Sequence, residues 1–119
     1  MTTEKPTSSE KLAIIWSSGD RDVALTLVYP YARNSKIQGW WDQVRLIVWG
    51  PSEKILAHDV ELQDGLHGLS KEGVELVACK GCSDNYETSG KLEELGVDVI
   101  YMGEPLTRML KEGWRVLTF

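Results

Sequence analysis

Residues 74–102, with the sequence VELVACKGCSDNYETSGKLEELGVDVIYM, decide the fold of this chain. Two apolar runs, 74–79 and 97–102, are typical of strands that are covered on both faces of a sheet. The more polar stretch between them predicts a helix over roughly residues 84–95, which ends at Gly96 because glycine commonly follows the last turn of a helix. A strand, a helix and a second strand in this order indicate a parallel βαβ unit.

The same alternation continues over the rest of the chain. The other predicted strands are Lys11–Ser17, Gln43–Trp49 and Trp114–Phe119. The other predicted helices begin at Asp20 or Asp22, at Ser52 and near Pro105; the first meets Pro30, where we expect a kink or break, the second runs to about Glu72, and the last ends at Gly113. This pattern predicts a three-layer α/β/α fold with a five-stranded, mainly parallel sheet, flavodoxin-like or Rossmann-like. We prefer the strand order 2-1-3-4-5, which right-handed crossovers allow.

Length and composition predict one domain. The chain has 119 residues, of which 42% are apolar, so it can build a single core. We expect residues 1–10 to form a flexible tail and residues 11–119 to form the domain. The polar opening, MTTEKPTSSE, gives no sign of a secretory signal, and no apolar run approaches the length of a membrane span.

Charge and cysteine content exclude further classes. A net charge of −5 argues against nucleic-acid binding, which needs a basic surface. Two cysteines, three positions apart, are too few for the disulfide framework of a secreted protein. The sequence therefore predicts a cytoplasmic protein whose thiols are free or reversibly oxidised.

The loops after the strands form the expected site. In open α/β sheets, ligands bind beyond the carboxyl ends of the strands, where the strand order reverses. In the preferred order this point lies between strands one and three. The predicted ligand-binding residues are Trp16, Ser17, Ser18, Gly19, Trp49, Gly50, Ser83, Gly103 and Glu104. Backbone amides after strand one could hold an anion, or the loop could simply cap a helix. Neither common glycine-rich nucleotide motif is present, and we expect no cofactor.

Cys79 and Cys82 are the predicted reactive residues. A thiol at the start of a helix is favoured as the reactive thiolate, and Lys80 adds a positive charge between the two cysteines. The spacing also suits a small redox disulfide. Inert, buried thiols are the alternative, because cysteine is one of the most buried residue types.

A metal site and a thioredoxin fold are less favoured. Zinc would need two more ligands, but His58 and His67 are predicted on opposite faces of one helix, so we expect no metal within one chain. Thioredoxin-like proteins carry CxxC after an early strand, whereas here the pair follows the third strand.

Other polar and aromatic residues have plainer interpretations. We expect the acidic residues of the second long helix to form a solvated face; they are Glu53, Asp59, Glu61, Asp64 and Glu72. Trp16 and Trp49 either line the predicted pocket or belong to the core. Adjacent Trp40 and Trp41 should leave at least one ring exposed in a monomer, which favours an oligomer.

From strand three onward, the segment ACKGCSDNY and the helix and strands that follow resemble the DsrE/DsrF-like family of small sulfur-handling α/β proteins. The first strand with its serine-rich loop and the VWGPS segment are similar to the family as well, so the resemblance covers roughly residues 11–119. It implies a flavodoxin-like fold, trimers or hexamers, and sulfur carried as a persulfide on Cys79. Cys82 stands where many members have a small or apolar residue, which makes a disulfide-resolving step conceivable.

Three functions stay open at this point. The first is a sulfur-relay or thiol-redox protein, a sulfurtransferase-like carrier rather than an ordinary enzyme, with a protein as sulfur donor or acceptor. In it, Cys79 is the acceptor and nucleophile, Cys82 the resolving thiol and Lys80 an electrostatic aid. The others are a small-molecule or nucleotide-binding module and a structural subunit, both without catalysis.

Overall fold

The computed structural model describes residues 10–119, so the predicted tail lies, except for Glu10, outside the described residues. Five strands form one parallel sheet: β1 (Lys11–Trp16), β2 (Gln43–Val48), β3 (Glu75–Cys79), β4 (Asp98–Ile100) and β5 (Arg115–Thr118). Eight helical segments connect them: α1 (Arg21–Val23), η1 (Ala24–Val28), α2 (Tyr29–Ile37), α3 (Pro51–His58), α4 (Val60–Lys71), α5 (Lys80–Asn85), α6 (Ser89–Glu94) and α7 (Gly103–Lys111). The predicted parallel α/β architecture is confirmed.

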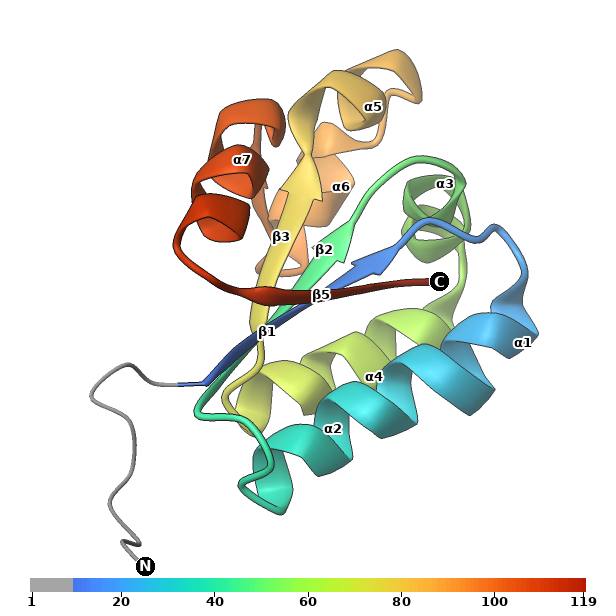
Figure 1. Cartoon of the computed structure of the whole chain (residues 1–119). Coiled ribbons are helices and arrows are strands. Elements are labelled where there is room, and N and C mark those ends of the chain that lie inside the picture. The colour runs from blue at the N-terminus through green and yellow to red at the C-terminus, as the bar shows by residue number, and fades with distance from the viewer. Residues whose placement is uncertain (1–9) are drawn as a thin grey trace, which may run out of the picture.

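The predicted strand order is wrong. The sheet has the order β4-β3-β2-β1-β5, so β2 lies between β1 and β3. Each step from β1 to β4 moves one place in the same direction, and right-handed crossovers then put the intervening helices on one face. The connection from β4 back to β5 crosses the sheet in the other direction, which places α7 on the opposite face (Figure 1). The expected crevice between strands one and three does not exist.

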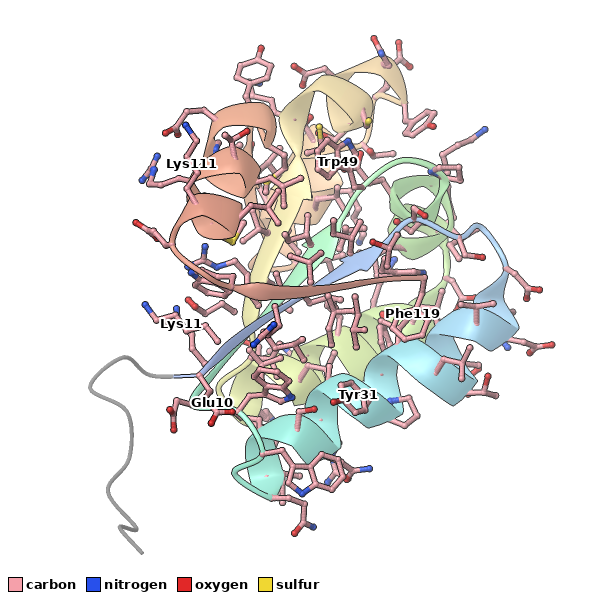
Figure 2. The ribbon with its side chains drawn as sticks, viewed as in Figure 1. Glu10, Lys11, Tyr31, Trp49, Lys111 and Phe119 are labelled. Atoms are coloured by element: carbon pink, nitrogen blue, oxygen red, sulfur yellow. The ribbon has the colours of Figure 1, made fainter. Side chains whose placement is uncertain are left out.

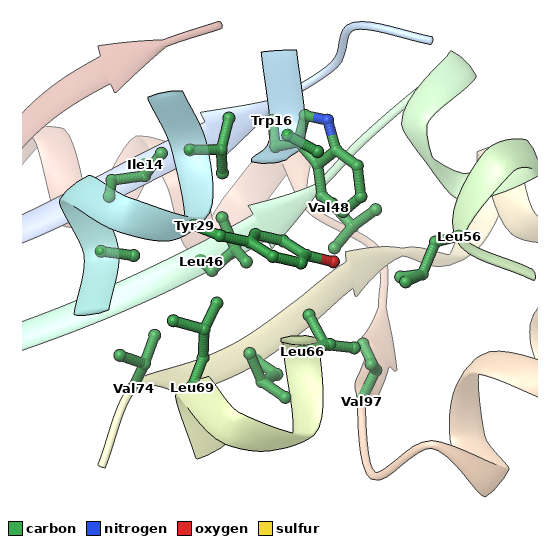
Figure 3. Close-up of a cluster of buried hydrophobic side chains, with 14 of the residues drawn as sticks. Ile14, Trp16, Tyr29, Leu46, Val48, Leu56, Leu66, Leu69, Val74 and Val97 are labelled. Carbon is green, nitrogen blue, oxygen red and sulfur yellow. The ribbon is translucent and has the colours of Figure 1, made fainter. Parts of the chain in front are cut away.

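The core has two parts, because successive side chains along each strand point to opposite faces of the sheet. The larger cluster includes Trp16, Leu46 and Ala78, and it packs under α2 and α4 (Figure 3). Tyr29 crosses this cluster, where its ring meets that of Trp16 edge-on and its hydroxyl donates a hydrogen bond to the carbonyl of Leu62. Neighbouring strand residues point to the other face, because successive side chains alternate.

The smaller cluster, on the other face, lies beneath α7. Its buried members are Ala13, Ile47, Val77, Cys79, Met102, Met109 and Trp114. Cys79 follows Ala78, so the alternation that directs Ala78 toward α4 directs Cys79 toward α7. The position of the strand-end thiol in the smaller cluster therefore follows from the register of β3.

Three predicted helices differ from the observed ones. Pro30 does not break its helix: a π-helical segment, η1, precedes it and the backbone continues to Ile37. The second long helix divides at Asp59, which is extended and caps α4 with its side chain. The third divides at Glu87, whose φ of 58° cannot continue a helix. Within residues 10–119, no helix is long and apolar enough to cross a lipid bilayer.

Candidate functional site

Cys79 and Cys82 lie together where β3 ends and α5 begins. Cys79 is the last residue of β3 and the N-cap of α5, and Cys82 lies in the first turn of that helix. Both are free thiols. Cys79 is only 8% exposed and belongs to the smaller core cluster, whereas Cys82 is half-buried and packs against it. Of the two, Cys82 is therefore the thiol that a partner molecule reaches first.

The two thiols interact directly. The pKa of Cys82 is raised above its ordinary value, first by burial and then by the charge and hydrogen bonding of the Cys79 thiol. The backbone amide of Gly50 opposes this by favouring the thiolate. The sequence analysis expected a helix start to favour the thiolate, whereas burial is the main influence on the pKa of Cys82 and raises it.

Lys80 does not direct its charge to the thiols. Its amino group pairs with Asp84 at 3.1 Å, one turn along α5, and lies 5.8 Å from the centre of the Tyr101 ring. The carboxylate of Asp84 is the main reason that the pKa of Lys80 is raised. This partly exposed ion pair stabilises α5 weakly, and the structure gives no support for Lys80 as an electrostatic aid.

Gly50 and Trp49 border the thiol pair from the end of β2. Gly50 has φ 86° and ψ −141°, a conformation open in practice only to glycine, and this turn aims its amide at the Cys82 sulfur. Trp49 is half-buried and packs against the same cluster as Cys82 (Figure 2). Both predicted residues are thus brought to the cysteines.

The loop after β1 is not free to hold an anion. The backbone amides of Ser17 and Ser18 both donate to the carbonyl of Phe119, at 2.7 and 3.2 Å, and the Ser17 hydroxyl donates to the same oxygen. Gly19 packs against Pro51. Because β5 lies beside β1, the end of the chain described here occupies the amides that were predicted to bind a ligand.

The other predicted ligand-binding residues have structural surroundings. Trp16 is fully buried in the larger cluster, so it belongs to the core and does not line a pocket. Ser83 is also fully buried, and its hydroxyl bonds to the carbonyl of Lys80 and to Ser89. Gly103 begins α7, where exposed Glu104 pairs with Arg108.

Glu53, which the sequence analysis assigned to a solvated face, is fully buried. It lies in the first turn of α3, and no side chain among the described residues forms a hydrogen bond or ion pair with its carboxylate. Burial raises its pKa to about 7, with a smaller opposing effect from the backbone amide of Cys79. Its charge in turn contributes to the raised pKa of Cys82, so this carboxyl lies close enough to the dithiol to influence it electrostatically.

Among the described residues, the cysteines belong to no cluster that could hold a metal ion, and they do not line the hollow beneath α7. Within residues 10–119, no three His, Cys, Asp or Glu side chains are grouped so that they could hold a metal ion. His58 and His67 are exposed and lie on different helices, α3 and α4. A hollow of about 440 Å³ lies beneath α7, bordered by Arg45, Glu75 and Asp98 near the amino ends of their strands. Ile100 and Met102 also border this hollow, but neither cysteine does.

Fold and site together define a class: a small parallel α/β protein with a free dithiol at the carboxyl edge of its sheet. The chain belongs to the family of BT1422 from Bacteroides thetaiotaomicron, a conserved protein of unknown function. The two are 35% identical over 92% of this chain and 95% of the solved one, with a TM-score of 0.89. Comparison with protein-family models and with curated proteins gives no match.

Two further solved structures share the fold. MTH1491 from Methanobacterium thermoautotrophicum, of unknown function, is 24% identical over 92% of this chain and 99% of its own, with a TM-score of 0.73. The ychN protein from E. coli is 18% identical over the same shares, with a TM-score of 0.68. At these identities the likeness shows the fold alone.

Proposed function

We propose that this protein is a sulfur-relay or thiol-redox protein that carries sulfur on its Cys79–Cys82 dithiol. The main observation in favour of this function is that two free thiols interact at the carboxyl edge of the sheet. Cys82 is half-buried and Cys79 is buried. A free dithiol suits a reducing compartment, so we propose a cytoplasmic location. The resemblance to DsrE/DsrF-like proteins points to the same chemistry.

The exposures of the two thiols suggest their roles. The sulfur of half-buried Cys82 attacks the outer sulfur of a donor persulfide, R–S–SH. The bond between the two donor sulfurs breaks, the donor leaves as the thiol R–SH, and the protein holds Cys82–S–SH. An acceptor thiol removes the outer sulfur by the reverse reaction, so no oxidant is needed. This assignment exchanges the roles that the resemblance implies, because Cys79 is the less accessible residue.

The Cys82 persulfide can also react with Cys79 within the same chain. Its thiolate can attack the inner sulfur of Cys82–S–SH, which forms the Cys79–Cys82 disulfide and releases hydrogen sulfide. A low-molecular-weight thiol would then reduce the disulfide to the starting dithiol. This pathway is the thiol-redox form of the same proposal.

Incubation with glutathione persulfide, followed by intact-mass analysis, tests the proposal. The wild-type chain should gain the mass of one sulfur atom and lose it on addition of a low-molecular-weight thiol. Cys82→Ser should lose this uptake, and Cys79→Ser should keep it. The double variant is the matched control for nonspecific adducts. A wild-type chain that neither gains more sulfur than the double variant nor forms the Cys79–Cys82 disulfide would show that the proposal is wrong.

A structural subunit is the second candidate, favoured by one exposed surface. Leu27, Trp40 and Leu117 are 48%, 53% and 40% exposed, and they border a hollow of about 540 Å³ between α2 and β5. The residues that line this hollow carry no charge, so two copies of this acidic chain can meet there without repulsion. We therefore propose a homo-oligomer. Light scattering tests this proposal by measuring the molar mass in solution. The wild type should have a mass above that of the monomer, and Trp40→Glu should have a mass close to that of the monomer.

A further inference from the structure

Glu53 is a buried carboxyl that the fold does not explain. Within residues 10–119 it is the only Asp, Glu, Lys, Arg or His side chain that is buried, and it is completely inaccessible. A buried acidic group normally forms an ion pair or several hydrogen bonds, because losing its hydration costs several kcal/mol otherwise. Glu53 has neither, since no side chain among the described residues pairs with its oxygens and the backbone amide of Cys79 is the polar group that acts on it.

The groups around Glu53 leave the dithiol as its chemical neighbour. The backbone amide of Cys79, at the end of β3, lies on one side, and the Cys82 thiol on α5 experiences its charge. Among the described residues, no charged side chain contributes to the shift of its pKa. The nearest lysine along the chain, Lys54, directs its amino group to the Tyr86 ring at 5.3 Å.

A thiol in this position needs somewhere to pass its proton. Cys82 is held in its protonated form by burial, so it must lose a proton to react and regain one when sulfur leaves. Water reaches Cys82 only from its exposed side, because its neighbours Cys79 and Glu53 are both buried. A carboxyl whose pKa is close to neutrality can both accept and return a proton, which is the condition for effective acid–base catalysis.

We infer that Glu53 is the proton carrier of the dithiol, an inference that rests on the sulfur-transfer proposal above. During uptake, the Cys82 thiol passes its proton to the Glu53 carboxylate as its sulfur bonds to the outer sulfur of the donor. The electron pair of the broken donor S–S bond leaves with the donor thiolate, which takes the proton from Glu53. During release, an acceptor thiolate attacks Cys82–S–SH, and the departing Cys82 sulfur takes its proton from the Glu53 carboxylic acid.

Two measurements on Glu53→Gln test the inference with opposite expected signs. The rate of sulfur release from the Cys82 persulfide to a low-molecular-weight thiol should fall by roughly a hundredfold, the lower end for loss of an acid–base group. The rate of Cys82 alkylation by iodoacetamide, measured in the Cys79→Ser background, should rise instead. Removing the negative charge of Glu53 lowers the pKa of the thiol and leaves more thiolate. A purely structural role would change both rates in the same direction.

The pH dependence and the controls complete the test. In the wild type, release at a constant concentration of acceptor thiolate should slow as pH rises through about 7, because Glu53 loses its proton there. Glu53→Gln should lack this inflection in the pH profile, and Glu53→Met should lack it as well. Glu94→Gln, an exposed change on α6, is the matched control. If the wild type transfers sulfur and Glu53→Gln transfers it equally fast, the inference is wrong and the sulfur-relay proposal stands. If the wild type transfers none, both are wrong.

Discussion

Glu53 should make the stability of this protein depend on pH in a way that one substitution removes. In the folded chain its pKa is about 7, against an ordinary value of 4.5. Between these values the folded state holds a proton that the unfolded state has lost, so the free energy of unfolding falls as pH rises. The difference between the two pKa values corresponds to about 3 kcal/mol, because one pKa unit is worth about 1.4 kcal/mol.

Urea unfolding of the wild type and Glu53→Gln measures this effect. The chains should be compared at about pH 5 and about pH 8, with linear extrapolation to water. From the lower to the higher pH, the wild type should lose about 3 kcal/mol more than the variant. The amide of the substituted glutamine is also buried without partners. This lowers the free energy of unfolding of the variant by the same amount at every pH and does not change its dependence on pH.

Comparison of two chains that differ at one residue removes the contributions of other groups. Both exposed histidines are present in each chain. Asp59 and Asp84 have lowered pKa values, owing mainly to hydrogen bonds from Arg21 and Ser89, so they titrate below this range. Parallel curves for wild type and variant between pH 5 and 8 would refute the reasoning, because they would mean that Glu53 is solvated or paired in solution.

Two further predictions concern packing and the ion pair on α5. Gly65→Ala should destabilise the fold by about 1–3 kcal/mol, because the added Cβ would lie 2.7 Å from the Tyr29 ring. At Gly68 on the same helix an added Cβ meets nothing within 4 Å, so Gly68→Ala should stabilise the fold by about 0.5–1 kcal/mol. Thermal unfolding checks both, and equal shifts would contradict the packing of α2 against α4. Lys80→Met should change the Cys82 alkylation rate by less than about twofold, because the lysine charge is taken up by Asp84. A tenfold decrease would restore Lys80 as an electrostatic aid.

The α/β class could be predicted from the sequence because short apolar runs alternate regularly with helical segments that end at glycine. The order of the strands in the sheet needs a different signal. Charged residues do not supply that signal, because the edge segments 97–102 and 114–119 and the central segment 43–49 each contain one of them. The preferred order placed this last segment at an edge, where its apolar side chains would have been poorly covered.

The candidate site was predicted in part. The cysteines and the segment Trp49-Gly50 are brought together, because β2 and β3 pair in parallel and their carboxyl ends lie side by side. Glu53 was missed because acidic residues are usually exposed. Helical spacing could have found it: Leu56 and Ala57 lie three and four positions later, so an α3 that buries these two also buries Glu53.

The burial of the site changes which property of a thiol matters. At an exposed helix start, reactivity would come from a stabilised thiolate, and a nearby lysine would be its natural partner. Here burial raises the pKa of Cys82, Lys80 pairs elsewhere, and the unpaired ionisable group beside the thiols is a carboxyl. An apolar environment with one proton carrier disfavours a persulfide anion and favours the exchange of neutral thiol and persulfide. Sulfur transfer by this dithiol should therefore be limited by movement of a proton, which is why the charge state of Glu53, and not that of Lys80, should control its rate.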